Sequence, residues 1–206
     1  MLGFWRRRSS TGTGTAQRWV VVDVETSGMD ASCDELISIA GVALRGGRVH
    51  PADSIELFIK PSKVSPRDNI LVHGIGEQAQ LAGTDARDAI RSFIDFVGPA
   101  PLIAFHAQLD RGFLVRATKL HSDRPLDNAW LDLAELAPVL DPEARLKSLD
   151  EWLQRYRIPV IARHTAAGDA FATALLAARL LFKARRQGAS DLSALRRLAG
   201  SARWIG

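Results

Sequence analysis

Three short segments of the chain carry acidic residues that could bind a metal ion. Two of these segments also contain a histidine. The first segment is Asp23-Val24-Glu25, the second contains His106 and Asp110, and the third contains His164 and Asp169. Carboxylates are the ligands that hard dications such as Mg²⁺ or Mn²⁺ prefer. Two such ions ~3.5 to 4 Å apart can activate a water molecule and stabilise the leaving oxygen of a phosphodiester. The candidate metal ligands are therefore four acids: Asp23, Glu25, Asp110 and Asp169.

Each segment taken alone also has an explanation that involves no metal. Asp23 and Glu25 can be solvated at the end of a strand, and Asp110 and Asp169 suit the first turn of a helix, where the helix dipole favours an acid. The combination is harder to explain without a metal. Two carboxylates on one side of an apolar strand repel each other and resist burial unless a cation binds them. A histidine with a pKa of about 6.5 suits proton removal from the attacking water. The order of the segments therefore indicates metal-dependent hydrolysis of a phosphodiester.

The sequence around the first acids predicts an antiparallel meander of three strands. Trp19 to Val24 is rich in β-branched residues and apolar on both faces, which is typical of a central strand. Leu36 to Leu44 has the pattern of a second strand. The Gly46-Gly47 turn then leads into a third strand centred on Ser54 to Ile59. Short turns between consecutive strands favour antiparallel pairing.

After the meander, the hydrophobic period changes and strands alternate with helices. Apolar residues at helical spacing predict a helix over Asp85 to Val97. The later elements that we expect are a strand over Leu102 to Phe105, a helix over Asp110 to Lys119, a strand over Ala129 to Leu133, and helices over Leu146 to Tyr156, Ala166 to Arg186 and Asp191 to Leu198. This order predicts an α/β fold of three layers, in which helices flank a mixed five-stranded sheet.

The bulk properties indicate one globular domain. The 206 residues suffice for a single well-buried core. The net charge of +4 mildly favours binding to polyanionic partners. Cys33 is the only cysteine and no apolar run approaches the ~20 residues of a membrane span, so we expect a cytoplasmic protein that makes no membrane contact. We expect a flexible basic and Ser/Thr/Gly-rich arm over residues 1–17, a folded domain over 18–187 and a short tail over 188–206.

The ordered motifs resemble those of the DEDDh 3′–5′ exonuclease family, which includes the epsilon proofreading subunit of bacterial DNA polymerase III. The resemblance runs from about Trp19 to Phe182. It is carried by VDVETSGM at residues 22–29, DELISIAGV at 34–42, VHGI at 72–75, AFHAQLD at 104–110 and HTAAGDA at 164–170. It implies a ribonuclease H-like domain, which agrees with the meander followed by alternating strands and helices.

The resemblance also implies roles for individual residues. The four acids would hold two Mg²⁺ or Mn²⁺ ions, and His164 would be the general base. Thr26 and Met29 match positions that line the terminal nucleotide, and His73 and His106 match positions near the substrate strand. The chain departs from the family pattern at two positions that are not metal ligands: Ala107 stands where asparagine is frequent, and Leu109 where an aromatic residue is frequent. These departures concern substrate preference rather than hydrolysis.

The function that we expect is a two-metal 3′–5′ exonuclease that releases nucleoside monophosphates from the 3′ end of single-stranded or frayed DNA. Three alternatives stay open. One is a proofreading subunit of a replicative DNA polymerase. For docking onto the polymerase, about twenty residues follow the last long helix, and their possible contact residues are Leu192, Leu195, Leu198 and Trp204. The second is a 3′–5′ exoribonuclease acting on short RNA, because two-metal chemistry does not use the 2′-hydroxyl. The third is a nucleic-acid-binding module without catalysis, which the complete set of acids argues against.

Overall fold

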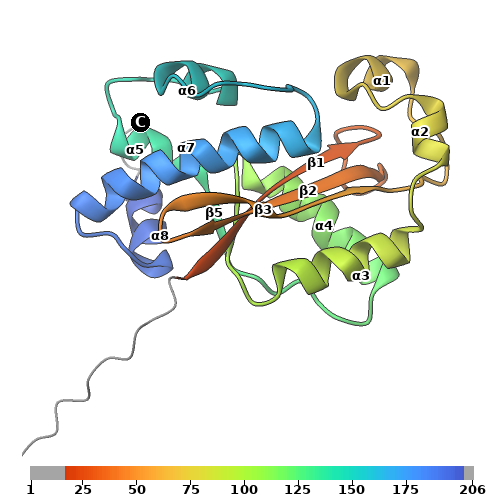
Figure 1. The fold of residues 1–206 in the computed structure, drawn as a ribbon, viewed down its shortest axis with the longest axis horizontal. Coiled ribbons are helices and arrows are strands. Elements are labelled where there is room, and N and C mark those ends of the chain that lie inside the picture. The colour runs from red at the N-terminus through yellow and green to blue at the C-terminus, as the bar shows by residue number, and fades with distance from the viewer. Residues whose placement is uncertain (1–16, 202–206) are drawn as a thin grey trace, which may run out of the picture.

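The computed structural model describes residues 17–201 and is built around a five-stranded mixed sheet of order β3-β2-β1-β4-β5 (Figure 1). Strands β1 (Arg18–Thr26), β2 (Leu36–Arg45) and β3 (Arg48–Phe58) form the antiparallel meander. Strands β4 (Leu102–Ala104) and β5 (Trp130–Asp132) continue the sheet in parallel with β1. The predicted fold class is therefore confirmed.

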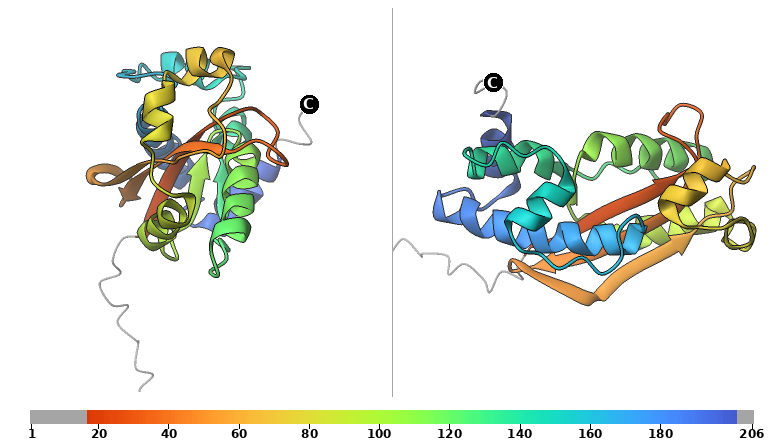
Figure 2. Two further views of the ribbon diagram at one scale, coloured as in Figure 1. Left: turned by 90° about the vertical axis from the view of Figure 1, so that its right-hand side faces the viewer. Right: turned by 90° about the horizontal axis from the view of Figure 1, so that it is seen from above.

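Helices cover both faces of this sheet, so that β1 is buried on both sides (Figure 2). Val20 and Val22 pack on the side of α3 (Ala86–Val97) and α4 (Ala107–His121). The alternate residues of β1, Trp19 and Val21, belong to the core of the other face. That face is covered by α5 (Leu133–Leu140), α6 (Leu149–Arg155), α7 (Ala166–Arg186) and α8 (Leu192–Gly200).

The long helix α7 lies close against the sheet because the side chains that it buries are small. Ala170, Ala174 and Ala177 are completely buried, and Leu176 and Leu180 fill the space around them. Alanine combines the highest helix propensity with a side chain that lets the helix backbone approach its neighbour. The first turn of α7 is thereby held rigidly beside the end of β1, where the first two acids of the sequence lie.

Three helices of the structure were not predicted from the sequence. Helices α1 (Arg67–His73) and α2 (Glu77–Leu81) were not predicted, because each is short and buries few residues, so no apolar stripe marks it in the sequence. The predicted strand over 129–133 ends one residue early, and α5 begins at Leu133, because the side chain of Asp132 accepts a hydrogen bond from the Ala134 N–H and caps that helix.

Two further expectations concern the ends of the chain. The expected helix near the C-terminus is confirmed as α8, whereas nearly all of the predicted arm over residues 1–17, together with Trp204, lies outside the described residues. No helix between residues 17 and 201 is long and apolar enough to cross a membrane. The division into arm, domain and tail stays a prediction.

Candidate metal centre and active site

Three of the four predicted acids meet at the end of β1. Asp23 and Glu25 of β1 and Asp169 of α7 each place a carboxylate oxygen within 4.8 Å of the others. Because side chains alternate along a strand, Asp23 and Glu25 point to the same face as Val21, which is the face that α7 covers. Asp110 is not a member of this group of three, but its charge raises the pKa of Asp23, so its carboxylate lies in the neighbourhood of the other acids.

Asp110 is positioned by a carboxylate that the sequence analysis did not single out. Helix α4 starts after His106, which has a left-handed backbone conformation (φ 58°). Asp132, at the end of β5, accepts hydrogen bonds from the backbone N–H groups of His106 (3.0 Å) and Ala107 (2.9 Å). The same carboxylate caps α5 through the Ala134 N–H (2.8 Å). One side chain therefore fixes the start of two helices, and Asp110 occupies the first turn of α4.

The third motif is held by a close contact between a loop and the first turn of α7. The hydroxyl of Thr165 caps the helix by accepting from the Gly168 N–H (3.1 Å). A side chain at Gly168 would lie 1.8 Å from the carbonyl oxygen of Ala162, so only glycine permits this approach. The backbone N–H of His164 then donates to Asp169 (3.2 Å), while the His164 side chain remains exposed.

Burial and mutual repulsion disfavour the charged forms of these acids. Burial raises the pKa of Asp23 well above its ordinary value, and the charges of Asp110, Asp169 and Glu25 raise it further. Burial, with a contribution from Asp169, raises the pKa of Glu25 to about 7. Burial also raises the pKa of Asp110 to about 8, although hydrogen bonding to its own backbone and that of Val24 acts in the opposite direction. A cation bound among these carboxylates would reverse this balance.

The protein itself supplies one cation at this position. Arg163 donates from Nη1 to Asp169 and from Nε to Asp150 of α6, the latter at 2.6 Å. Its positive charge lowers the pKa of both Asp23 and Glu25, against the effect of burial. Arg163 was not identified from the sequence, because nothing local to it indicates that its side chain reaches the acids. The placement of Arg163 shows that the cluster attracts positive charge. The carboxylate oxygens of the cluster are the kind of ligand that hard dications prefer.

The residues predicted to line the terminal nucleotide lie where β1 ends. The hydroxyl of Thr26 donates to the carbonyl oxygen of Gly28 (2.5 Å) and closes the turn that follows the strand. Asn69 of α1 donates to the backbone oxygen of Thr26 (3.3 Å), which brings α1 to this turn. Met29 is 77% exposed. Substrate contacts for Thr26 and Met29 stay predictions.

The two histidines predicted near the substrate strand differ in their surroundings. His73 is buried, and both ring nitrogens have protein partners: Nδ1 accepts from the Ile75 N–H (3.0 Å) and Nε2 lies 3.3 Å from the Ser65 hydroxyl. Burial lowers its pKa, which disfavours a charged contact with phosphate. This geometry ties His73 into the α1–α2 segment, and its contact with substrate stays a prediction. His106 is exposed at the start of α4, where a substrate contact stays a prediction.

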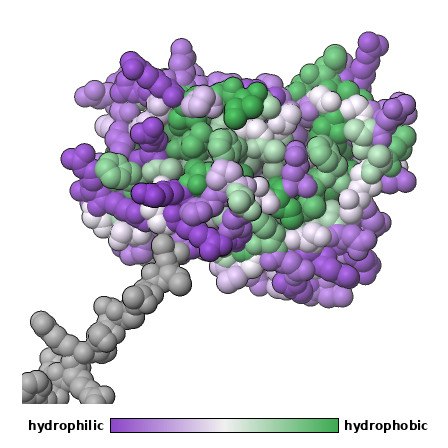
Figure 3. Space-filling model, viewed as in Figure 1, coloured by the Kyte–Doolittle hydropathy of each residue, from purple (hydrophilic) through white to green (hydrophobic). Residues whose placement is uncertain are grey.

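Exposed apolar side chains surround the end of β1. They lie in the β1–β2 connection, in α1 and in the connection between α6 and α7; the residues are Met29, Leu71, Val72, Val160 and Ile161. Figure 3 shows apolar surface over α1 and over the α6–α7 connection. Apolar side chains such as these can pack against the faces of nucleobases without reading their edges.

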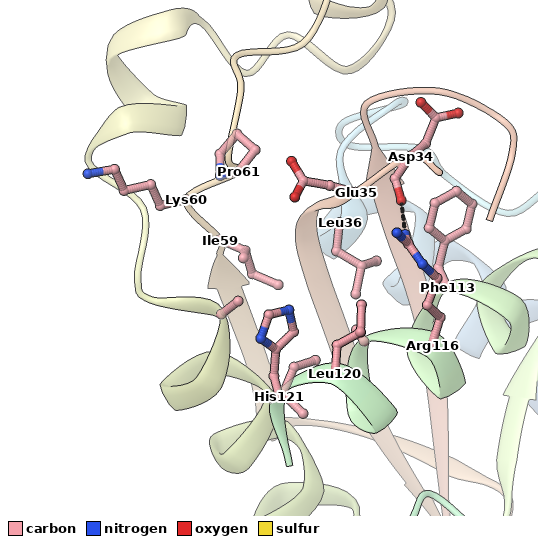
Figure 4. Close-up of a pocket in the computed structure, with 13 residues that line it drawn as sticks. Asp34, Glu35, Leu36, Ile59, Lys60, Pro61, Phe113, Arg116, Leu120 and His121 are labelled. Atoms are coloured by element: carbon pink, nitrogen blue, oxygen red, sulfur yellow. Dashed lines mark hydrogen bonds between the residues drawn. The ribbon is translucent and has the colours of Figure 1, made fainter. Parts of the chain in front are cut away.

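A separate pocket lies between the start of β2, α3 and α4 (Figure 4). Its lining includes Lys60, His121 and Glu35 but none of the four acids. Arg116 of α4 donates to the backbone oxygen of Asp34 (2.6 Å) at one side of this pocket. The bond ties α4 to the β1–β2 connection and thereby supports the position of Asp110.

Comparison with protein families and curated proteins is consistent with this geometry. The RNase_T family model, described as an exonuclease, matches residues 20–177. The chain is 32% identical over 173 residues to a PolC-type DNA polymerase III of Bacillus subtilis and 33% identical over 180 residues to a DNA polymerase III subunit epsilon-like protein of Rhodobacter capsulatus. The matches cover 84% and 86% of this chain, but only 12% and 25% of those proteins.

Solved structures share the fold at lower sequence identity. Exonuclease X in complex with 5′-overhanging duplex DNA superposes with a TM-score of 0.70 at 18% identity, covering 88% of this chain and 99% of that one. Exonuclease I of E. coli in complex with a dA16 oligonucleotide has a TM-score of 0.72 at 17% identity, covering 82% of this chain and 42% of that one.

Proposed function

The chain belongs to the RNase_T family of DEDD exonucleases, and we propose that it is a metal-dependent 3′–5′ exonuclease that acts on single-stranded or frayed DNA. The observation that carries the proposal is the meeting of Asp23, Glu25 and Asp169 within 4.8 Å, with Asp110 close by, at the end of β1. Ordinary protein cores avoid such a group of carboxylates, because each raises the cost of ionising the others.

The four acids would hold the two divalent ions. When bound, Mg²⁺ or Mn²⁺ would supply positive charge for the phosphoryl oxygens and make water a stronger acid. Asp23 and Glu25 are fixed by the sheet, and Asp110 and Asp169 by the first turns of two packed helices. This rigid support suits a site whose ligands must keep one arrangement through the reaction.

His164 is suited to be the general base. Its exposed side chain lies on a loop while its backbone is tied to Asp169, so the imidazole can take a proton from the attacking water without being a metal ligand. The oxygen of that water forms the new bond to phosphorus as the bond to the 3′-oxygen of the preceding nucleotide breaks. The products would be a nucleoside 5′-monophosphate and a strand shortened by one residue, with Thr26 and Met29 beside the departing nucleotide.

DNA is the substrate that the comparisons support better than RNA. Exonucleases X and I, which share the fold, were solved with DNA, and the curated relatives are DNA polymerase III proteins. Those relatives also support a second candidate function, in which the chain proofreads beside a replicative polymerase. Stable co-purification with a polymerase subunit would favour that role, whereas activity of the chain alone would favour an independent exonuclease.

The test is hydrolysis of matched DNA and RNA strands labelled at the 3′ or 5′ end, with Mg²⁺, Mn²⁺ or EDTA. We expect mononucleotides from the 3′ end only, loss of activity in EDTA, and faster cleavage of DNA. Asp23→Asn should lower kcat by about 100-fold or more, because charge stabilisation worth several kcal/mol is lost. Asp127→Asn, at an exposed acid on the surface, is the matched control. Cleavage from the 5′ end, or full activity of Asp23→Asn, would contradict the proposal.

A further inference from the structure

We propose that the substrate strand continues from the acidic cluster along the β5 edge of the sheet, where Arg111 of α4 and Arg196 of α8 bind its phosphates. The inference rests on the proposed function and extends it to nucleotides upstream of the one that is cleaved. It assigns a role to α8, which lies beyond the residues 20–177 that the family model matches.

Two adjoining hollows form the path, which we call the edge groove. The first hollow lies between Ala31 of the β1–β2 connection and His106 at the start of α4. The second lies between Arg111 of α4, the β5 edge strand and Arg196 of α8. Gln108, Asp132 and Glu135 line both hollows. The edge groove therefore starts near His106, at the beginning of the helix that carries Asp110, and ends at α8.

Arg111 and Arg196 place positive charge on opposite walls of the second hollow. Arg111 is exposed, and its side chain has no hydrogen bond or ion pair within residues 17–201. Arg196 donates from Nε to the backbone oxygen of Trp130 (2.9 Å), which holds its side chain at the β5 edge. This bond uses one of the five N–H donors of the guanidinium group and leaves the planar fork available for a phosphate.

The two acids in the edge groove are engaged by the protein. Asp132 accepts hydrogen bonds from the backbone N–H groups of His106, Ala107 and Ala134, so both of its carboxylate oxygens are occupied by the protein. Glu135 also has an interaction partner. The ligand that the hollow suits is therefore a chain of phosphates, which a positively charged groove can follow without reading sequence.

The experiment compares kcat, KM and binding for a dinucleotide and for a strand of about 12 nucleotides. Arg111→Gln and Arg196→Gln should each raise KM and Kd for the long strand about 5-fold, leave kcat unchanged and leave the dinucleotide unaffected, because a dinucleotide does not reach the groove. Each lost phosphate contact should also reduce the slope of log affinity against log salt by ~0.7. Arg197→Gln, on α8 but outside the groove lining, is the matched control.

Binding of a 5′-fluorescent strand, followed by anisotropy in EDTA, separates this proposal from the catalytic one. Weaker long-strand binding by both variants, without hydrolysis by the wild-type protein, would support the edge groove and contradict the proposed function. Hydrolysis by the wild-type protein, with unchanged long-strand KM and Kd in both variants, would overturn the edge groove alone. Equal losses on the dinucleotide and the long strand would overturn it too, because the arginines would then act on the cleaved nucleotide or on folding. Unfolding temperatures of all variants exclude a general loss of structure.

Discussion

At the scale of single residues, Arg163 acts on the candidate metal centre without being one of its proposed ligands. Its guanidinium group joins Asp169 of the acidic cluster to Asp150 of α6, and it immediately precedes His164. A cation in this place offsets the repulsion among buried acids. A bound dication would offset the same repulsion and would therefore compete with Arg163 for Asp169.

We expect Arg163→Gln to lower the unfolding temperature of the metal-free protein and to tighten Mn²⁺ binding by about 3- to 10-fold, or roughly 1 kcal/mol. The metal would no longer have to displace a guanidinium group. Calorimetric titration with Mn²⁺ and thermal unfolding with and without the metal measure the two effects. Arg157→Gln, at an exposed arginine of the same connection, is the control. Weaker Mn²⁺ binding by Arg163→Gln would show that Arg163 assists the metal rather than competing with it.

At the scale of secondary-structure elements, the position of Asp110 depends on how α4 begins. The helix starts at His106, whose backbone has a left-handed conformation. A residue other than glycine keeps this conformation only when its surroundings support it. Asp132 gives that support from the neighbouring strand, and it also caps α5. Two helix starts and one proposed metal ligand therefore depend on a single carboxylate.

Asp132→Ala should destabilise the protein by about 1 to 3 kcal/mol, because three backbone N–H groups lose their acceptor. It should also lower kcat, because Asp110 would no longer be held in one position. Asp132→Asn keeps one acceptor oxygen and should lie between the wild-type protein and Asp132→Ala in both properties. Urea unfolding and steady-state kinetics test this order. Wild-type stability in Asp132→Ala would show that water replaces the carboxylate at no cost.

At the scale of the whole molecule, the buried acids link stability to pH and to metal. In the unfolded chain, carboxyl groups have pKa values of about 4. In the folded protein, burial raises the pKa of Glu25 to about 7 and that of Asp110 to about 8. Between about pH 4 and about pH 8 the folded state therefore binds more protons than the unfolded state, and the free energy of unfolding falls as the pH rises. Asp53 adds little pH dependence in this window, because hydrogen bonds from Arg18 and Arg45 lower its pKa to about 2 and the stability that it contributes is lost only at lower pH.

We therefore expect the unfolding temperature of the protein in EDTA to fall between about pH 5 and about pH 8 by at least ~2 to 4 °C, the shift that 1 kcal/mol produces in a chain of this size. Mg²⁺ or Mn²⁺ should restore stability at the alkaline end, because it binds the ionised acids. Glu25→Gln should flatten the pH dependence, whereas Asp127→Asn should not. Scanning calorimetry across this range measures the slope, and a metal-free unfolding temperature that rises with pH would refute the linkage.

The sequence by itself determined the mixed sheet, helices α3 and α7, and the grouping of the acids. These features follow from local patterns: the β-branched run of β1 is apolar on both faces, and the residues that α3 buries have a helical period. The two-residue spacing of Asp23 and Glu25 places both carboxylates on one face of β1 whatever surrounds the strand. Helices α1 and α2 escaped prediction because they are short and bury few residues, and α5 because it begins directly after β5 with a cap from Asp132.

Only the tertiary structure decided how the acids are supported and what surrounds them. Asp132 reaches His106 across 26 positions of sequence, and Arg163 occupies the cluster through contacts with two different helices. The edge groove exists because α8 returns to β5, so that Arg196 bonds to Trp130 66 residues away. His73, which the motif placed near the substrate, is buried with both ring nitrogens engaged. The physical reason is the same in each case: side-chain period is a local property, whereas charge compensation, burial and capping depend on partners that only the folded chain brings together.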